Sequence, residues 1–301
     1  MKHFRIGIIG PGRVGLSLGS ALKACGYPLY GVMGRMEASS SEAATRLGCA
    51  IAHSYREILE RSDLVLLCVP DKNLPQIACS LASSGAVKEE QIFLHVSGSL
   101  SSEVLRPLKD AGGRVGSLHP LRAFAAPLSA PDMAGTYFSF EGDTNIRPAV
   151  EKLTSDLKGF LFDLPADGKA LYHAGACMAS NYLVTLFAVA RDIFQRLGIP
   201  ADEASKAILS LVRGTVANLA LGAPEKALTG PVARGDEETI SAHLDALRSR
   251  APEYLQTYLT LGKATLDLLA SANGDMGAVA ALLTQSEDQR RTYLEARKNH
   301  S

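Results

Sequence analysis

The residues best suited to chemistry begin with a histidine in the segment GSLHPLRAF, residues 116–124. His119 precedes Pro120, and because proline restricts the residue before it to extended geometry, His119 is expected on a fixed backbone at a strand end. An imidazole near neutral pKa can give or take a proton while a hydride moves to or from a carbon. The position therefore predicts His119 as the proton-handling group of a hydride-transfer site, with a core or capping histidine as the alternative.

A second polar set is expected on one face of a long helix in the second half of the chain. His173 and Ser180 are seven residues apart, almost two helical turns, so they share a stripe with Cys177 and, slightly rotated, Asn181. Small residues flank this stripe and would let a ligand come close. We expect His173, Ser180 and Asn181 to orient a substrate beside His119, and a solvated helix surface is the alternative.

A glycine-rich turn, GPGRVG at residues 10–15, follows a short β-rich run and precedes a helical pattern. In a strand–turn–helix unit this spacing is typical of dinucleotide binding. Gly10 permits the tight turn, Gly12 lets the backbone approach a pyrophosphate at the helix N-terminus, and Gly15 allows close packing of helix on strand. The turn residues predicted to contact the cofactor are Gly10, Pro11, Gly12, Arg13, Val14 and Gly15.

The position that selects between NAD and NADP lies roughly twenty residues beyond the last glycine. An acid there binds the ribose 2′-hydroxyl of NAD, whereas this chain has Arg35, followed closely by Glu37. A guanidinium suits the 2′-phosphate of NADP through charge and paired hydrogen bonds. We therefore predict NADP as the cofactor. Glu37 is the counter-evidence, because a turn shifted by two residues would bring its carboxylate to the ribose.

Two further strand ends are expected at the carboxyl edge of the sheet, where ligands of such folds bind. One carries Val69, Pro70 and Asp71, and the next carries Ser97. We predict all four as cofactor contacts, although Asp71 could instead cap the helix that follows.

The elements that must position these residues form an α/β fold. Continuous apolar strands alternate with helices, which predicts a Rossmann-type, doubly wound and mainly parallel sheet covered on both faces. After residue 165 helical periodicity takes over. The predicted domains are a nucleotide-binding domain at 1–165 and an all-α substrate and dimerisation domain at 166–301. The predicted strands are 4–10, 28–34, 64–70, 91–98, 114–120, 136–142 and 159–165, and the predicted helices are 42–47, 73–83, 168–198, 201–221, 236–248, 251–272 and 275–297.

Composition excludes several partner classes. The formal net charge is zero, with 31 basic and 31 acidic residues, which argues against nucleic acid or an anionic membrane surface as the main partner. The N-terminal apolar run is short and broken by glycines, and we expect no run of membrane-spanning length. The five cysteines form no CxxC pair and no histidine pair has helix-face metal spacing, so we expect no metal and a cytoplasmic, reducing environment.

One loop of the helical half is unusual. The segment ALTGPVARGDEETISAHLDAL, residues 227–247, breaks the chain at Gly230 and Pro231 and then offers Asp236 as the N-cap of the next helix. Arg234 has no such structural explanation. It is predicted to bind a substrate carboxylate or to pair across a subunit interface, with a solvated side chain as the alternative.

Taken together, the stretches IIGPGRVG, HVSG, SLHPLRAF, YHAGACMASNYL and LTGPVARGD resemble bacterial Rossmann-like NADP oxidoreductases with a C-terminal domain of unknown function, DUF2520. More distantly the chain looks like the superfamily of 6-phosphogluconate dehydrogenase, ketopantoate reductase, pyrroline-5-carboxylate reductase and prephenate dehydrogenase. That resemblance implies a Rossmann domain followed by a helical domain that builds a dimer.

Two comparisons within that superfamily bear on the proton-handling group. Where hydroxyacid dehydrogenases and ketopantoate reductase carry a catalytic lysine four residues before an asparagine, this chain has Cys177 before Asn181, so their mechanism does not carry over. The His-Pro pair of SLHPL is similar to the one that ends a strand in prephenate dehydrogenases, where the histidine bonds the substrate hydroxyl. The resemblance therefore favours His119.

These observations predict a homodimeric NADP-dependent oxidoreductase that transfers a hydride between the nicotinamide and a small, anionic carbonyl or alcohol metabolite in an interdomain cleft. The absence of the lysine suggests a second class, a non-catalytic NADP(H)-binding sensor or scaffold. A third possibility is an imine reductase similar to pyrroline-5-carboxylate reductase, or a reductase that links NADP to a deazaflavin.

Overall fold

The computed structural model describes residues 4–269 and 277–284 of the chain. The protein divides into two compact units, Met1–Asn181 and Tyr182–Ser301. The first unit ends at Asn181 and so includes one helix after the last strand of the sheet. The domain boundary predicted from the sequence, at residue 165, lies before that helix. Of the helix predicted at 275–297, residues 277–284 are helical, and the remainder lies outside the described residues.

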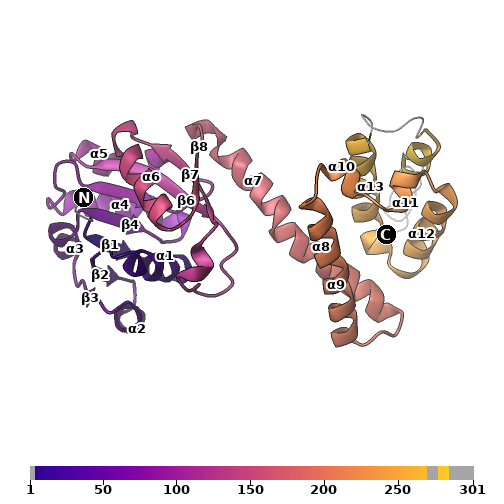
Figure 1. Ribbon diagram of the computed structural model, residues 1–301, viewed down its shortest axis with the longest axis horizontal. Helices are drawn as coiled ribbons and strands as arrows, with labels where there is room; N and C mark the ends of the chain where they lie inside the picture. Colours follow the sequence, from indigo (N-terminus) through magenta and orange to yellow (C-terminus); the bar gives the residue numbers. More distant parts are fainter. Residues whose placement is uncertain (1–3, 270–276, 285–301) are drawn as a thin grey trace, which may run out of the picture. The chain divides into compact units, whose positions relative to one another are not determined.

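The first unit is built on one eight-stranded sheet (Figure 1). The strands stand in the order β3-β2-β1-β4-β5-β6-β7-β8, and all neighbours are parallel except β6 and β7, which are antiparallel. The predicted doubly wound, mainly parallel sheet is confirmed, and the two-residue β3 is an addition. The strands are β1 (Ile6–Ile9), β2 (Leu29–Met33), β3 (Ala50–Ile51), β4 (Leu64–Leu67), β5 (Ile92–His95), β6 (Arg114–Leu121), β7 (Tyr137–Gly142) and β8 (Phe160–Asp163).

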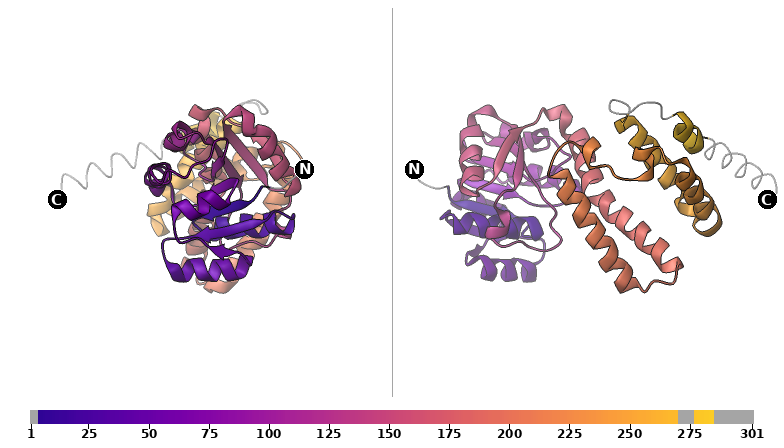
Figure 2. Two further views of the ribbon diagram at one scale, coloured as in Figure 1. Left: turned by 90° about the vertical axis from the view of Figure 1, so that its left-hand side faces the viewer. Right: turned by 45° about the vertical axis from the view of Figure 1, so that its right-hand side comes forward.

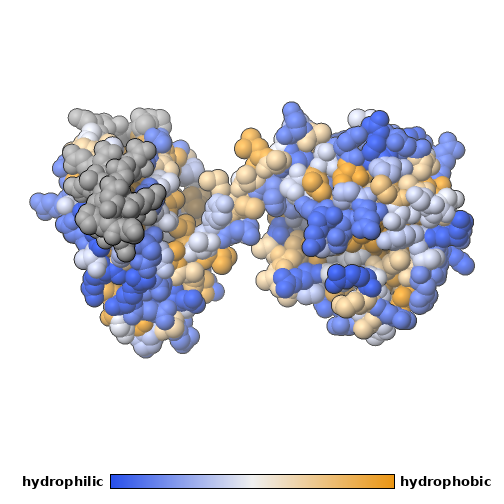
Figure 3. Space-filling model, turned by 180° about the vertical axis from the view of Figure 1, so that it is seen from behind, coloured by the Kyte–Doolittle hydropathy of each residue, from blue (hydrophilic) through white to orange (hydrophobic). Residues whose placement is uncertain are grey.

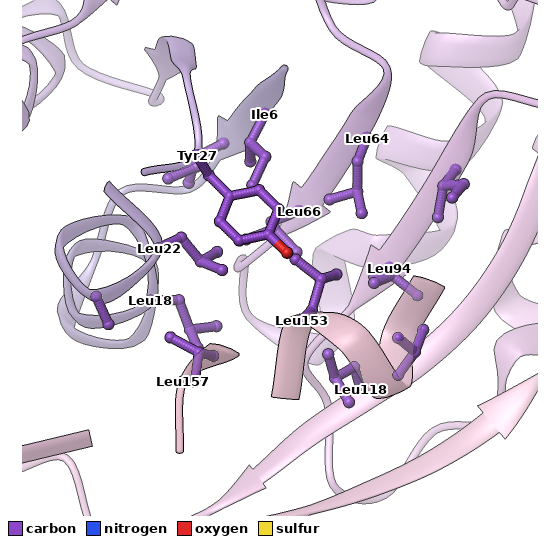
Figure 4. Close-up of a cluster of buried hydrophobic side chains, with 14 of the residues drawn as sticks. Ile6, Leu18, Leu22, Tyr27, Leu64, Leu66, Leu94, Leu118, Leu153 and Leu157 are labelled. Carbon is purple, nitrogen blue, oxygen red and sulfur yellow. The ribbon is translucent and has the colours of Figure 1, made fainter. Parts of the chain in front are cut away.

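Helices cover both faces of this sheet because its central strands are apolar on both sides. In β4, Leu64 and Leu66 face one hydrophobic cluster, and Val65 and Leu67 face the other. The first cluster, shown in Figure 4, receives side chains from α1 (Arg13–Ala24), α2 (Glu37–Leu47) and α6 (Arg147–Asp156). The second receives them from α3 (Tyr55–Arg61), α4 (Leu74–Ser83) and α5 (Arg106–Asp110).

The long helix predicted at 168–198 is two helices. α7 (Lys169–Ala179) ends at Ser180, whose φ of −118° and ψ of −64° depart from helical values, and α8 (Asn181–Arg196) begins at the next residue. Serine and asparagine favour helix ends over helix interiors because their side chains compete for backbone hydrogen bonds. The break separates the polar residues that a continuous helix would have held on one stripe.

The second unit is helical, as predicted. A four-residue connection at 197–200 turns the chain from α8 back into α9 (Ala201–Leu219), which is visible in Figure 2. Two short helices, α10 (Pro224–Ala227) and α11 (Pro231–Arg234), lead to α12 (Glu237–Arg250) and α13 (Leu255–Leu269). Ile240, Leu244 and Leu259 belong to the buried cluster of this unit.

Large apolar side chains remain exposed on α7, α8 and α9, and α8 has no buried residue. Figure 3 shows apolar patches at the surface among hydrophilic residues. The stretch Ala166–Arg196 has 31 residues and contains an 18-residue window with a mean hydropathy of 1.2, so it is long and apolar enough to cross a membrane by length and composition alone. The expectation that no run has those properties is therefore wrong, because the small and apolar residues of α7 and α8 are consecutive. The exposed residues are Leu171, Met178, Tyr182, Leu183, Val184, Leu186, Leu209, Leu211, Val216 and Leu219.

Candidate active site

The glycine-rich turn joins β1 to α1 under tight steric constraints. Gly10 has a φ of +85°, and a Cβ added to it would lie 2.6 Å from Cγ1 of Val69. A Cβ added to Gly15 would lie 2.6 Å from the carbonyl oxygen of Gly10. The first and third glycines therefore have the turn and packing roles predicted for them, and the turn lies against the end of β4.

Gly12 leaves the N-terminus of α1 uncovered. It is the N-cap residue, nothing lies within 4 Å of the Cβ it lacks, and α1 has neither a side-chain cap nor an acidic residue in its first turn. The first N–H groups of a helix have no partners within it, so those of Arg13, Val14 and Gly15 remain available. These donors, the positive end of the helix dipole and the exposed Arg13 guanidinium fit a phosphate group.

The predicted specificity residue lies in the loop beside this turn. β2 is the neighbour of β1, and a Cβ on Gly34 would lie 3.4 Å from Cδ of Pro11, so the two loops touch. Arg35 follows Gly34 and is exposed. Glu37 lies in the first turn of α2, where the helix dipole favours a carboxylate without any ligand. The placement of Glu37 thus has a structural explanation, and that of Arg35 does not.

Asp71 connects the loops that follow β4 and β5. Its Oδ2 atom accepts hydrogen bonds of 2.7 Å from both Ser97 Oγ and Ser99 Oγ, and α4 has no side-chain cap. Asp71 therefore does not cap the helix, the alternative raised by the sequence. It holds the β5 loop in place, with Pro70 and Val69 immediately before it at the end of β4.

His95 lies below this loop, fully buried at the end of β5. The N–H of Ser97 donates to its Nδ1 atom at 3.2 Å, so Nε2 carries the proton and donates to the carbonyl oxygen of Ser101 at 3.1 Å. Burial, followed by the charge of Lys169, lowers the pKa of His95 to about 4. His95 is thus a neutral, structural histidine.

His119 lies near the end of β6, two residues beyond Ser117, the last residue of β6 that pairs with β5. A hydrogen bond of 2.8 Å joins its Nδ1 atom to the hydroxyl of Tyr172 on α7. Its ring also meets that of His173 edge to face, with centroids 6.1 Å apart. The structure therefore brings together His119 and His173, as the sequence predicted, and adds Tyr172.

Gly98 lies against the rings of both His119 and His173. A Cβ added to Gly98 would lie 2.6 Å from Nδ1 of His173 and 3.0 Å from Nε2 of His119, so both rings pack closely against this glycine. Nδ1 of His173 is buried and has no hydrogen-bond partner among the residues that the structure describes. Its other nitrogen, Nε2, lies 3.7 Å from Sγ of Cys177. A buried polar atom without a partner is costly, so stability does not explain the placement of this nitrogen.

His119 is neutral at physiological pH. Burial lowers its pKa to about 4, and the positive charge of Lys169 acts in the same direction. Lys169 was missed by the sequence analysis, although it precedes Tyr172 and His173 by three and four residues and so shares their helix face. Burial also raises the pKa of Tyr172, which keeps its phenol protonated.

The remaining predicted residues lie at the break after α7 or belong to the second unit. Ser180 and Asn181 are exposed at the break between α7 and α8. Arg234 is exposed in the second unit, where it donates to the carbonyl oxygen of Thr229 at 2.6 Å and lies 3.6 Å from Asp236. Asp236 caps α12 as predicted, accepting from the N–H of Thr239. Within residues 4–269 and 277–284, no cluster of three or more His, Cys, Asp or Glu side chains could hold a metal ion.

Residues 1–120 match the model of a Rossmann-like domain, and residues 136–265 match the domain of unknown function DUF2520. The chain is a Rossmann-like protein with a DUF2520 domain. This confirms the family resemblance seen in the sequence. No curated protein matches the chain.

Several solved structures share the fold. One, from Bacteroides fragilis and named as a candidate NADP oxidoreductase, is 22% identical over 88% of this chain and 98% of its own, with a TM-score of 0.73. Pyrroline-5-carboxylate reductase of Coxiella burnetii is 14% identical over 95% and 98% of the two chains, with a TM-score of 0.59. An imine reductase of Myxococcus stipitatus in complex with NADP+ is 18% identical over 93% and 99%, with a TM-score of 0.61.

Proposed function

We propose that this protein is an NADP-dependent oxidoreductase that reduces a carbon–oxygen or carbon–nitrogen double bond in a small anionic metabolite. The observation that carries the proposal is the pair of imidazoles packed against Gly98, His119 and His173, in which Nδ1 of His173 is buried without a hydrogen-bond partner among the described residues. Such a pair can hold the heteroatom of a polar substrate. Proteins of the same fold include enzymes named for reduction of this kind.

The residues of the first unit fit NADP. The uncapped N-terminus of α1 suits the pyrophosphate, and Arg35 suits the 2′-phosphate. When bound, the nicotinamide supplies or accepts the hydride. Val69, Pro70, Asp71 and Ser97 line the neighbouring strand ends, where the contacts predicted from the sequence remain proposals.

His119 would polarise the substrate as a neutral group. If the phenol of Tyr172 donates to Nδ1, then Nε2 carries the proton of the imidazole and donates to the substrate oxygen or nitrogen. A donor aimed at the atom where negative charge develops stabilises the transition state. His173 would position the same atom, and Ser180, Asn181 and Arg234 remain proposed substrate contacts.

The cofactor is tested by fluorescence titration of NADPH and NADH on the wild type and on Arg35→Ala. Loss of a charge-assisted pair of hydrogen bonds costs about 1.5–3 kcal/mol, so NADPH should bind about 10- to 100-fold more weakly while NADH binding stays unchanged. Glu37→Gln is the matched control and should leave NADPH binding within twofold. Selective loss of NADH binding in Glu37→Gln would instead assign NAD.

The reaction is tested with small keto acids and with imines formed from them. His119→Asn should lower turnover of whichever compound is reduced by about 10²- to 10⁴-fold and leave NADPH affinity unchanged. Equal losses of turnover and cofactor affinity would contradict the role of His119. Tight NADPH binding with no reduction of either compound class would favour a sensor over an enzyme.

We also propose that the protein is a homodimer through its helical faces. Val184 on α8 and Leu211 on α9 are each 69% exposed, and apolar surface on this scale marks an interface. Light scattering after gel filtration should give twice the chain mass, and Val184→Asp with Leu211→Asp should give the monomer. Ser205→Asp is the control. Binding of the wild type to neutral lipid vesicles, with a monomeric mass in their absence, would show that a membrane covers this surface instead.

A further inference from the structure

Lys169 carries its ammonium group inside the protein. The residue is 2% exposed, and Nζ donates to the carbonyl oxygen of Ser97 at 2.9 Å and to Oγ of Ser117 at 2.6 Å. Both acceptors are neutral. The carboxylates of Asp71 and Glu141 attract the charge through space, while they accept hydrogen bonds from Ser97 and Ser99 and from Ser102, respectively.

A buried ammonium with neutral partners is expensive to maintain. Taking the charge out of water costs several kcal/mol, and a hydrophobic side chain of similar volume is often as stable or more so. Consistent with this cost, burial lowers the pKa of Lys169 to about 8. Stability alone therefore does not account for a lysine at this position.

The hydrogen bonds of Lys169 join the three segments that build the histidine pair. Ser97 directly precedes Gly98, and Ser117 lies two residues before His119 on the same face of β6. Lys169 itself is the first residue of α7, with Tyr172 and His173 on its helix face. One ammonium group thus sets the distance between the β5 loop, β6 and α7.

The same charge acts on the proton equilibrium of His119. Lys169 lowers the pKa of His119 more than any other charged residue, although less than burial does. A like charge disfavours an imidazolium. The other titratable groups that act on His119 are His173 on α7, Asp71 after β4 and His95 on β5; of these, Asp71 alone favours the charged form.

We propose that Lys169 is a positioning residue of this site, which ties α7 to the β5 loop and β6 and places a positive charge beside the histidine pair. The catalytic use of a neutral His119 rests on the proposed function. The placement of Lys169 and its effect on the pKa of His119 are independent of that function, because both can be measured without cofactor or substrate.

The test follows the histidine Cε1–H resonances by NMR between pH 3.5 and 8 in the full chain. The His119 resonance is identified by its loss in His119→Asn, and the exposed His53 serves as the internal reference. A pKa of about 4 leaves roughly one His119 in ten protonated at pH 5. In Lys169→Met and in Lys169→Gln, that fraction should rise at least twofold, because the like charge is gone.

Lys169→Arg is the matched control, since it keeps the charge and should leave the His119 titration close to that of the wild type. Lys169→Gln keeps a donor for Ser97, so the test does not depend on the folding of Lys169→Met. An unchanged His119 titration in a folded neutral variant would overturn the proposal. So would a wild-type His119 that titrates near pH 6.5. Neither result affects the NADPH titration of Arg35→Ala, so the proposed function is tested separately.

Discussion

Replacement of Gly98 by alanine gives the most direct test of the histidine pair. The added Cβ would lie 2.6 Å from Nδ1 of His173 and 3.0 Å from Nε2 of His119, whereas ordinary contacts begin at 3.4 Å. The ring of His173 must therefore move by about 0.8 Å and that of His119 by about 0.4 Å, unless the β5 loop shifts instead. Lys169 opposes such a shift because it holds the carbonyl oxygen of Ser97.

The expected effects follow from the size of this displacement. Overpacking of a buried site costs about 1–3 kcal/mol in the free energy of unfolding. A misplacement of about 1 Å in a catalytic group can lower the rate by about 10²-fold. Binding of NADPH to the glycine-rich turn should change less than twofold, because the proposed phosphate contacts are not among the nearest neighbours of the added Cβ.

Urea unfolding measures the stability change, and turnover and NADPH affinity are measured on the same preparations. Gly175→Ala on α7 is the control, because nothing lies within 4 Å of the added Cβ; it should stabilise the helix by about 0.5–1 kcal/mol. In the double variant Gly98→Ala with His173→Ala, part of the destabilisation should disappear, since the contact at 2.6 Å is gone. A Gly98→Ala protein with wild-type stability and turnover would refute the placement of both rings.

Three further outcomes are expected. The pKa values of His95 and His119 are both lowered to about 4, so between pH 6.5 and pH 4 the unfolded chain binds two protons that the folded one does not; urea unfolding should show a loss of about 2–3 kcal/mol for each histidine from pH 7 to pH 4.5, and a flat profile would contradict the neutral assignments. Tyr172→Phe should lower turnover by about tenfold at unchanged NADPH affinity; no change would remove Tyr172 from the site. Ser54→Ala, which deletes the N-cap of α3, should cost about 1 kcal/mol in the same unfolding assay, and no loss would mean that the cap is solvated.

The geometry of the glycine-rich turn could be predicted because it is local. Gly10 and Gly15 act within one turn of chain, and their neighbours are fixed once β1 and β4 are adjacent strands. Arg35 follows from the same strand order. The tight turn and the close packing of helix on strand each require a glycine at a fixed position, so the spacing of the glycines alone identifies the turn.

The partners of His119 could not be predicted because they depend on contacts between distant segments. Tyr172 is 53 residues away in sequence, and Lys169 is 72 residues from its acceptor Ser97. Helical periodicity predicted a polar stripe from His173 toward Ser180, yet α7 ends before Ser180. The residues of α7 that contact the site, Tyr172 and Lys169, instead precede His173 in the sequence. A lysine three residues before Tyr172 was the available signal, but only the packing of α7 on the strand ends shows that it is buried.

The two parts of the site therefore require different evidence. Arg13 and Arg35, the proposed phosphate contacts, are exposed, so their substitution should change affinity without a cost in folding. Lys169 and Gly98 are buried and packed against their neighbours, so any change there alters stability and chemistry together. A loss of turnover in a buried variant becomes evidence for mechanism only when a charge-conserving variant keeps the turnover, or when a contact-relieving variant restores the stability without restoring the turnover. Lys169→Arg and the Gly98→Ala, His173→Ala pair supply those comparisons, and they separate the placement of the imidazoles from their protonation.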